Sequence, residues 1–229
     1  MNVLVAGAAG GIGGACVGRL ERDGHRVLGV DRERVDVTRP GGAEEAVAEA
    51  ERLGPLEGVV HAVGMSGRSL GDGPPSACTD EGWAEVLRVN LESAFRLLRA
   101  AFPAFRRAGG GSFVAVGSVL AEHADPDFLT AAYATGKAGL RGLVRTAALE
   151  GAAEGIRVNV VEPGLADTPM ARRAIGDERI AARLRELQPL GGGAVSADAV
   201  AEAVCWLLSP AASRTTGVHL PVDGGWTVR

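Results

Sequence analysis

Short runs of consecutive apolar residues alternate along this chain with longer stretches in which apolar residues recur every three to four positions. The short runs predict strands at residues 2–6, 26–30, 35–37, 58–62, 112–117, 157–161 and 218–221. The longer stretches predict helices at residues 12–22, 42–52, 80–107, 130–154 and 196–208. A strand that is apolar throughout is buried on both faces, so the pattern indicates a parallel sheet between two layers of helices.

The order of these elements predicts an α/β protein with a doubly wound parallel sheet of Rossmann type, in three layers. Only residues 31–34 separate the strands predicted at 26–30 and 35–37, which is too short for a crossover helix. We therefore expect an abbreviated crossover between the second and third strands. No linker, repeat or change of composition divides the chain, which indicates a single domain over residues 1–229.

Composition excludes several classes of function. Of the 229 residues, 46% are hydrophobic and 23% are charged, which is ordinary for a globular protein. The net charge is −4 without a basic run, so we expect neither nucleic acid nor a membrane as partner. Cys16, Cys78 and Cys205 form no C-x-x-C pair, so neither a disulfide framework nor a metal site is expected, and a cytoplasmic setting is the simplest.

The segment VLVAGAAGGIGG places a strand before a group of glycines and a helix after it. Glycines permit a tight turn and a close approach to a pyrophosphate, which the N-terminus of the following helix binds. A plain turn in a chain with 34 glycines is the alternative. The position of the group at the first strand favours dinucleotide binding. The expected contacts are Gly7, Gly10, Gly11, Ile12 and Gly13.

Asp31, at the end of the second predicted strand, bears on the choice of dinucleotide. A carboxylate here accepts hydrogen bonds from the ribose hydroxyls of NAD and repels the 2′-phosphate of NADP. The neighbouring Arg32 and Arg34 could attract that phosphate instead, and Arg32 is counted among the cofactor contacts. We expect NAD, with NADP the less favoured cofactor. Asp36 and Val37 are expected near the adenine, although Asp36 is equally consistent with a plain loop residue.

The segment YATGK contains the only tyrosine and the only lysine of the chain, Tyr133 and Lys137. At positions i and i+4 of the helix predicted at 130–154, their side chains share a face. A free phenol has a pKa of about 10, and a nearby ammonium group favours the ionised form. The pair therefore predicts a tyrosine that exchanges a proton with an alcohol or carbonyl oxygen. A surface helix that carries both residues by chance is the alternative.

Two polar residues extend this site. Ser118 ends the run GSFVAVGS, and a hydroxyl at the carboxyl end of a parallel strand can hold a substrate oxygen. Asn90 lies within the long helix predicted at 80–107, where asparagine is a mediocre helix former. Its amide could bind a backbone group or a water molecule that links Lys137 to solvent, or it could be a tolerated helical asparagine.

With these motifs in place, the chain resembles the short-chain dehydrogenase/reductase family over nearly its whole length. The G-x-x-x-G-x-G motif of the family falls on Gly7, Gly11 and Gly13. Gly7, Gly10 and Gly13 also satisfy the G-x-x-G-x-x-G spacing of a longer, sugar-nucleotide-modifying branch. The length of the chain and its ending, GVHLPVDGGW, favour the shorter oxidoreductase branch. The resemblance places the catalytic tetrad of the family on Asn90, Ser118, Tyr133 and Lys137.

Other segments match the family in part. EPGLADTPM corresponds to the stretch that holds the nicotinamide carboxamide in relatives, which implies cofactor contacts from Pro163, Gly164 and Thr168. A substrate lid over about 165–192 is expected to follow it. HAVG, residues 61–64, replaces the family's N-N-A-G, and contacts there are expected from Ala62 and Gly64, with a structural role for His61. Ala6 replaces the threonine that usually precedes the first glycine.

The resemblance implies hydride transfer between NAD and a secondary alcohol or ketone, with Ser118 holding the substrate oxygen and Tyr133 passing the proton. It also implies that Lys137 lowers the tyrosine pKa and binds the nicotinamide ribose, that Tyr133 also contacts the cofactor, and that Asn90 supports a water relay. A non-catalytic NAD(P)-binding sensor or scaffold on the same fold is the alternative. An epimerase or dehydratase of nucleotide sugars would need a C-terminal substrate domain. The helix predicted at 130–154 is apolar or small on almost every side, which together with the family predicts a homodimer or homotetramer. The identity of the small-molecule substrate is not readable from the sequence.

Overall fold

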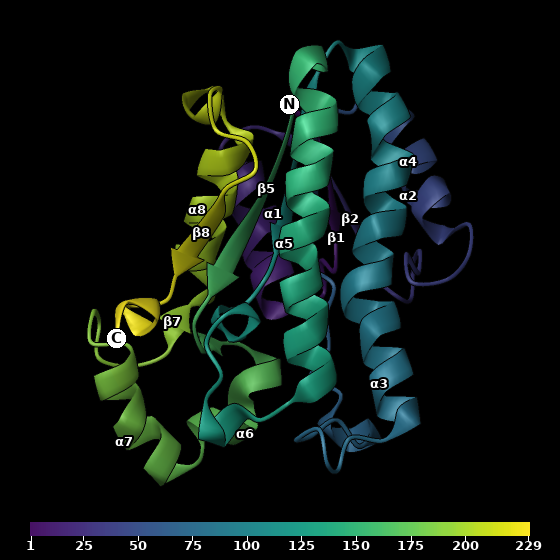
Figure 1. Ribbon diagram of the computed structural model, residues 1–229. Helices are drawn as coiled ribbons and strands as arrows, with labels where there is room; N and C mark the ends of the chain where they lie inside the picture. Colours follow the sequence, from purple (N-terminus) through teal and green to yellow (C-terminus); the bar gives the residue numbers. More distant parts are fainter.

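A six-stranded parallel sheet forms the centre of the computed structural model, which describes all residues from 1 to 229 (Figure 1). Its order is β2-β1-β3-β4-β5-β8, and every neighbouring pair is parallel. This confirms the doubly wound parallel sheet. The order reverses between β1 and β3, and a crevice at the carboxyl ends of such strands is where ligands bind in this architecture. The strands are β1 (Asn2–Ala6), β2 (Arg26–Val30), β3 (Gly58–His61), β4 (Gly111–Val116), β5 (Ile156–Pro163) and β8 (His219–Val222).

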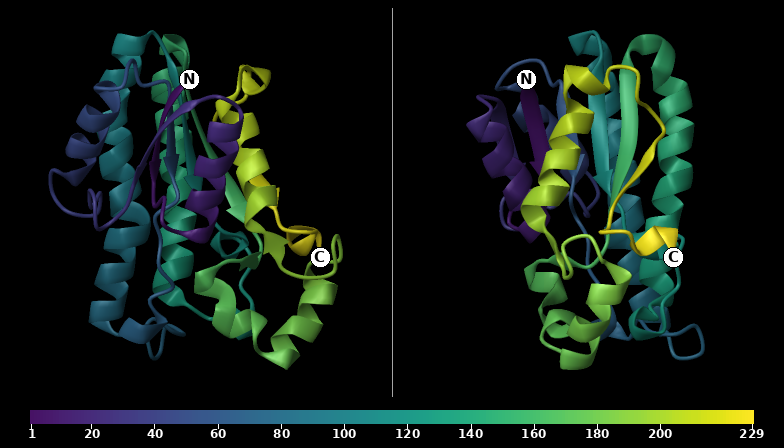
Figure 2. Two further views of the ribbon diagram at one scale, coloured as in Figure 1. Left: turned by 180° about the vertical axis from the view of Figure 1, so that it is seen from behind. Right: turned by 90° about the vertical axis from the view of Figure 1, so that its left-hand side faces the viewer.

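Helices cover both faces of the sheet. α1 (Gly11–Arg22) and α8 (Ala197–Leu208) lie on one face, and α2 (Gly42–Glu51), α4 (Ser93–Ala108) and α5 (Ala131–Gly151) lie on the other (Figure 2). Alternate residues of β1 serve the two layers, because Leu4 and Ala6 join one hydrophobic core and Val3 and Val5 join the other. The apolar runs in the sequence are continuous because both faces of these strands are buried. Short 3-10 helices occupy Arg68–Leu70, Val119–Ala121, Pro126–Phe128, Ala152–Glu154, Pro169–Ala171, Pro210–Ala212 and Trp226–Val228.

The strand predicted at 35–37 is wrong, because this segment forms turns. The Asp31 carboxylate accepts from the backbone N–H groups of Glu33 and Arg34, at 3.0 and 3.3 Å. The Asp36 carboxylate accepts from the N–H and hydroxyl of Thr38, at 2.9 and 2.6 Å. Such local bonds compete with a strand ladder. The expected short crossover and the strand after it are therefore both absent. β2 is the edge strand of the sheet, and a loop leads from it directly to α2.

The helix predicted at 80–107 is interrupted in its middle. It begins as α3 (Asp80–Leu87), widens to a π-helical segment at Arg88–Glu92 and continues as α4. The Ser93 hydroxyl donates to the Val89 carbonyl at 2.6 Å within this segment. A π-helical turn inserts one residue into a helix and is frequent at functional sites. Here it contains Asn90, which is fully buried.

The segment expected as a lid, 165–192, lies below the carboxyl ends of the strands and carries two helices that the sequence pattern did not predict (Figure 1). They are α6 (Arg172–Ile175) and α7 (Glu178–Leu187), and a small two-stranded sheet of β6 (Ala166–Asp167) and β7 (Val195–Ser196) frames them. A separate hydrophobic cluster joins this segment to the C-terminus. Its buried members are Val119, Ala174, Ile180, Leu184 and Trp226.

An ionic cluster also ties α7 to the loop that precedes α5. Arg183 binds both carboxylate oxygens of Asp125, at 2.8 and 2.6 Å, and also pairs with Asp127. Arg179 binds Asp127 at 2.6 Å from a more exposed position. Because Asp125 is only 5% exposed, its pairing with Arg183 is better protected from water than a surface ion pair.

No helix combines the length and apolar character needed to cross a membrane.

The ionic cluster makes the order of α7 depend on Asp125. In Asp125→Asn, the Arg183 guanidinium loses its buried carboxylate, and we expect amide hydrogen exchange in α7 to accelerate about 10-fold or more. Arg179→Gln is the control, because it removes only the exposed arm of the cluster and should change exchange little. Equal protection of α7 in wild type and Asp125→Asn would show that the cluster does not hold this helix.

Candidate active site

A glycine-rich turn connects β1 to α1. Gly7 has φ of +87°, a left-handed conformation that favours glycine. A Cβ on Gly13 would lie 2.0 Å from the Gly7 carbonyl oxygen, so the turn and the first turn of α1 are in direct contact. No side chain caps the N-terminus of α1 at Gly10. Its first backbone N–H groups are therefore free to bind an anion such as a pyrophosphate.

A cavity of about 790 Å³ begins at this turn and extends toward the lid. Its volume falls within the range usual for small-molecule and cofactor sites. Most of the residues predicted for the site line it together, from five separate parts of the chain. They are Gly10, Gly11, Ile12, Gly13, Ala62, Gly64, Ser118, Tyr133, Lys137, Pro163, Gly164 and Thr168. The glycine turn at one end and polar side chains at the other fit a nicotinamide dinucleotide.

The remaining predicted contacts do not line the cavity. Gly7 opens the glycine turn, and its α-carbon packs against the Ala62 backbone, while Val37 is 3% exposed within the larger core. The Asp36 carboxylate is occupied by Thr38. Asp31 uses one oxygen, Oδ1, for its turn, while Arg32 is exposed without an ion pair. Contacts from these residues to an adenosine group stay predictions.

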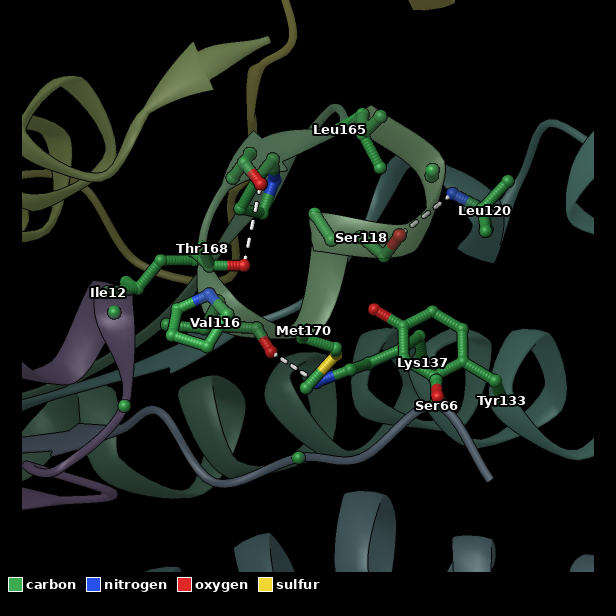
Figure 3. A pocket seen from close by; sticks show the side chains of 18 of the residues that line it. Ile12, Ser66, Val116, Ser118, Leu120, Tyr133, Lys137, Leu165, Thr168 and Met170 are labelled. Atoms are coloured by element: carbon green, nitrogen blue, oxygen red, sulfur yellow. Dashed lines mark hydrogen bonds between the residues drawn. The ribbon is translucent and has the colours of Figure 1, made fainter. Parts of the chain in front are cut away.

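Lys137 is almost completely buried, at 4% exposure. Its Nζ donates to the Val116 carbonyl oxygen at 2.7 Å, at the end of β4 (Figure 3). Burial lowers the pKa of Lys137 to about 8, which leaves the ammonium mostly protonated at neutral pH. A Cβ on Gly64 would lie 3.4 Å from this Nζ, so the backbone after β3 packs against the charge.

Tyr133 lies half-buried one helical turn before Lys137, and the ammonium is 5.8 Å from the centroid of its ring. Burial raises the pKa of Tyr133 above its ordinary value, and the nearby Ser118 hydroxyl opposes the shift. The prediction that Lys137 makes this phenol acidic is therefore not met by the protein alone. A further positive charge or a bound ligand is needed to favour the tyrosinate.

Asp72 fixes the start of α5 and was missed by sequence reasoning. Its two carboxylate oxygens accept from the backbone N–H groups of Ala132 and Tyr133, both at 3.0 Å. Thr130, the residue at the N-cap, makes no side-chain cap of its own. A buried carboxylate thus holds the tyrosine backbone from 60 positions away, and no local pattern in the sequence indicates this.

Ser118 lies two residues beyond β4 and is 6% exposed. Its hydroxyl oxygen accepts from the Leu120 N–H at 3.2 Å (Figure 3), which leaves the hydroxyl hydrogen available to donate to a substrate. The Tyr133 hydroxyl lies on the same side of the pocket (Figure 3). Two hydroxyls thus converge where one substrate oxygen can bind both.

Asn90 acts on the backbone of the pocket wall. Its Oδ1 accepts from the Met65 N–H at 2.8 Å, and its Nδ2 donates to the Met65 carbonyl at 2.9 Å. Of the alternatives left open by the sequence, the backbone contact is the one found. Asn90 thereby fixes the loop after β3, which includes Gly64 beside Lys137.

Gln188, also missed, holds the segment after β5. It is completely buried, and its amide binds both backbone groups of Leu165 and the Gly193 carbonyl. A Cβ on Gly164 would lie 2.0 Å from the Gln188 Oε1. The cofactor-side wall of the cavity therefore depends on a glycine at 164 and an amide at 188.

A cavity at the switch point of a doubly wound sheet, with a glycine turn at one end, is the arrangement of dinucleotide-binding α/β enzymes. A family model described as "Enoyl-(Acyl carrier protein) reductase" matches residues 33–227. The chain belongs to the short-chain dehydrogenase/reductase family of oxidoreductases.

Individual relatives agree with this assignment. A 3-oxoacyl-(acyl-carrier-protein) reductase from Mycobacterium avium is 34% identical, over 98% of this chain and 89% of the relative. The cis-4-hydroxycyclohexanecarboxylate dehydrogenase of Sinomonas cyclohexanicum is also 34% identical, over 98% of this chain and 95% of the relative. Among solved structures, the aldohexose dehydrogenase of Thermoplasma acidophilum superposes with a TM-score of 0.89 and 28% identity, covering 99% of this chain and 94% of that one.

His61 is a structural residue, as expected. It is completely buried at the end of β3, with its Nε2 2.8 Å from the Ser93 hydroxyl of the π-helical segment. Since Ser93 donates its own hydrogen to Val89, the Nε2 of His61 is the donor here. Burial, and to a smaller extent the charge of Lys137, lowers the pKa of His61 to about 3.

This depressed pKa makes stability depend on pH. The unfolded chain binds a proton at His61 near pH 6.5, whereas the folded protein resists it down to about pH 3. The stabilising contribution is therefore present above pH 6.5 and is lost as the pH falls, by at most about 1.4 kcal/mol per pH unit. Urea unfolding from pH 7 to 4 should show a steeper loss for wild type than for His61→Asn. Parallel curves would place the ionisation elsewhere.

Proposed function

We propose that this protein interconverts a secondary alcohol and a ketone by hydride transfer with NAD(H). One observation carries the proposal: the hydroxyls of Ser118 and Tyr133 and the ammonium of Lys137 meet in the cavity that begins at the glycine turn. The nicotinamide, when bound, supplies or accepts the hydride. The side chains of the protein handle the substrate oxygen and its proton.

Ser118 and Tyr133 have complementary roles at that oxygen. Ser118 donates its free hydroxyl hydrogen to the substrate oxygen and orients it, because its own oxygen is fixed by the Leu120 N–H. In reduction, the carbonyl oxygen gains negative charge and takes the proton of the Tyr133 hydroxyl. In oxidation, the tyrosinate takes the alcohol proton back.

Lys137 supplies the positive charge of the site at neutral pH. With one N–H given to Val116, two donors remain for a ribose hydroxyl or for a water chain to solvent. Its charge also favours the ionised form of Tyr133 when a substrate or cofactor fills the cavity and excludes water. Asn90 acts as a positioning residue, because its amide binds only the Met65 backbone.

The cofactor choice rests on the end of β2. The Asp31 Oδ1 is used by the turn, and the second carboxylate oxygen remains for the adenine ribose hydroxyls. Arg34 pairs with Glu49 at 3.3 Å, which reduces its attraction for a 2′-phosphate. Arg32 is the residue that could bind such a phosphate. On this balance we favour NAD over NADP.

Self-association is part of the proposal. An apolar groove lies between α5 and the helix that runs from α3 through the π-helical segment into α4. Its main apolar lining residues are Leu87, Leu91, Phe95 and Leu143. Phe95 is 45% exposed there, and Leu149 further along α5 is 83% exposed. These exposed apolar side chains support a homodimer or homotetramer. The function proposed for the cavity does not depend on which of the two forms.

The assigned proton transfer predicts a large defect in Tyr133→Phe. Loss of the hydroxyl should reduce kcat by about 10²–10⁴-fold with any ketone substrate, while the dissociation constant of NADH stays close to that of wild type. Initial-rate assays of NADH absorbance at about 340 nm measure kcat, and calorimetry measures the dissociation constant of NADH. Turnover close to that of wild type would show that Tyr133 does not transfer the proton. The proposed mechanism would then be contradicted.

The cofactor assignment predicts the behaviour of Asp31→Asn. Asparagine keeps the oxygen that accepts from Glu33 and Arg34 but removes the charge that repels a 2′-phosphate. The ratio of kcat/KM for NADH to that for NADPH should be above one in wild type and should fall about 10-fold in the variant. A wild-type preference for NADPH would contradict the assignment and point to Arg32.

A further inference from the structure

Two arginines from separate segments line the same cavity as Ser118 and Tyr133. Arg68 begins the 3-10 helix that follows β3, and Arg173 lies in α6 of the lid. Both side chains are largely exposed, whereas Ser118 and Lys137 are buried, so the arginines stand at the mouth. A ligand bound at the two hydroxyls therefore shares its cavity with two cations.

Neither arginine is neutralised by the protein. No carboxylate lies within 4 Å of either guanidinium, whereas Arg179 and Arg183 nearby are paired with Asp125 and Asp127. Arg68 makes one long hydrogen bond of 3.4 Å, to the Asp127 carbonyl. Asp125 and Asp127 are thus used by other arginines, and Arg68 and Arg173 at the mouth have no ion-pair partner.

The surroundings of Arg68 show the same imbalance. Partial burial lowers the pKa of Arg68 and the charge of Arg173 lowers it further, while Asp72 acts in the opposite direction. Asp72 forms no ion pair with Arg68, because its two oxygens accept from N–H groups of α5, so its charge compensates the guanidinium only in part. Two neighbouring guanidiniums without an ion-pair partner are well suited to carboxylate or phosphate, which they bind through paired N–H donors.

The wall beside the lid is apolar. Phe128 and Trp226 lie with ring centroids 5.6 Å apart, and both line the cavity together with Leu120 and Leu165. The cavity thus offers hydroxyls for a carbonyl, aromatic and aliphatic surface for a hydrocarbon body, and cations at the mouth.

We propose that the substrate carries an anionic oxygen group, a carboxylate or a phosphate, which Arg68 and Arg173 bind at the mouth while its apolar body packs on Phe128 and Trp226. This assignment of a substrate class rests on the proposed oxidoreductase function. It makes Arg68 and Arg173 determinants of specificity, with no part in the hydride or proton transfer.

The test measures binding separately from turnover. Calorimetry in the Tyr133→Phe background with saturating NADH uses 4-oxo-4-phenylbutanoate and its primary amide, and phenacyl phosphate and the uncharged 2-hydroxyacetophenone. The first pair differs in charge at nearly constant shape, and the second pair differs by the phosphate group itself. We expect at least one anion to bind 10-fold or more tightly than its neutral partner, and the tighter anion identifies carboxylate or phosphate as the preferred group.

Variants then assign the charge to residues. Arg68→Gln and Arg173→Gln, each in that background, should weaken the anion by about 10- to 100-fold and leave the neutral compound and NADH unchanged. Arg172→Gln is the matched control, since it removes an equal charge from the neighbouring exposed residue that does not line the cavity. In otherwise wild-type protein, the same two changes should raise KM for the anion far more than they lower kcat.

The outcomes are distinguishable. Anions that bind no better than their neutral partners, or anions that bind as well to both arginine variants, overturn the proposal. A parallel loss of NADH affinity in the variants also overturns it, because the arginines would then bind the cofactor. If the anion binds through the arginines but wild-type protein never turns it over with NADH or NADPH, the oxidoreductase proposal fails and the anion site stands.

Discussion

A single buried ammonium group is the constraint around which the site is arranged. Transferring a lysine charge from water into a protein is unfavourable unless polar groups replace its hydration. Here the Val116 carbonyl at the end of β4 accepts one N–H, and the burial lowers the pKa of Lys137 to about 8 without neutralising it at pH 7. A Cβ on Gly64 would lie 3.0 Å from the Asn90 Oδ1 and 3.4 Å from the Lys137 Nζ, so the backbone here packs closely against both groups. The protein therefore maintains a positive charge beneath Tyr133 in a place that water reaches poorly.

Remote elements hold the groups that surround this charge. The π-helical segment turns Asn90 toward the Met65 backbone, and Asp72 fixes the N-terminus of α5 at Tyr133 itself. His61 joins β3 to that π-helical segment through Ser93. None of these three side chains lines the cavity. They position the loop after β3 and Tyr133 relative to Lys137. Proton transfer between fixed groups requires such precise positioning.

The parts of this site that the sequence could predict are those encoded locally. The glycine turn before a helix and the spacing of Tyr133 and Lys137 follow from one strand–helix unit and one helical turn, and both are found. The strand at 35–37 failed because Asp31 and Asp36 bind nearby backbone groups, which hydrophobic periodicity does not register. Asp72 and Gln188 act on backbone far away in the chain, so only the folded structure identifies them. The pKa of Tyr133 also differs from the sequence prediction, because burial raises it and outweighs the opposing effect of the Ser118 hydroxyl in the protein alone.

In the proposed mechanism, the acidity of Tyr133 depends jointly on Lys137 and a bound cofactor. Because this chain has a single tyrosine, the ionisation of its phenol can be measured directly. Ultraviolet difference absorbance at about 295 nm follows the ionisation of this one phenol as the pH is raised. We predict a midpoint above 10 in the free protein, a lower midpoint when NAD⁺ is bound, and no such lowering in Lys137→Met. A midpoint that does not move on binding NAD⁺, or that moves equally without the lysine, would contradict the central role given to the buried ammonium.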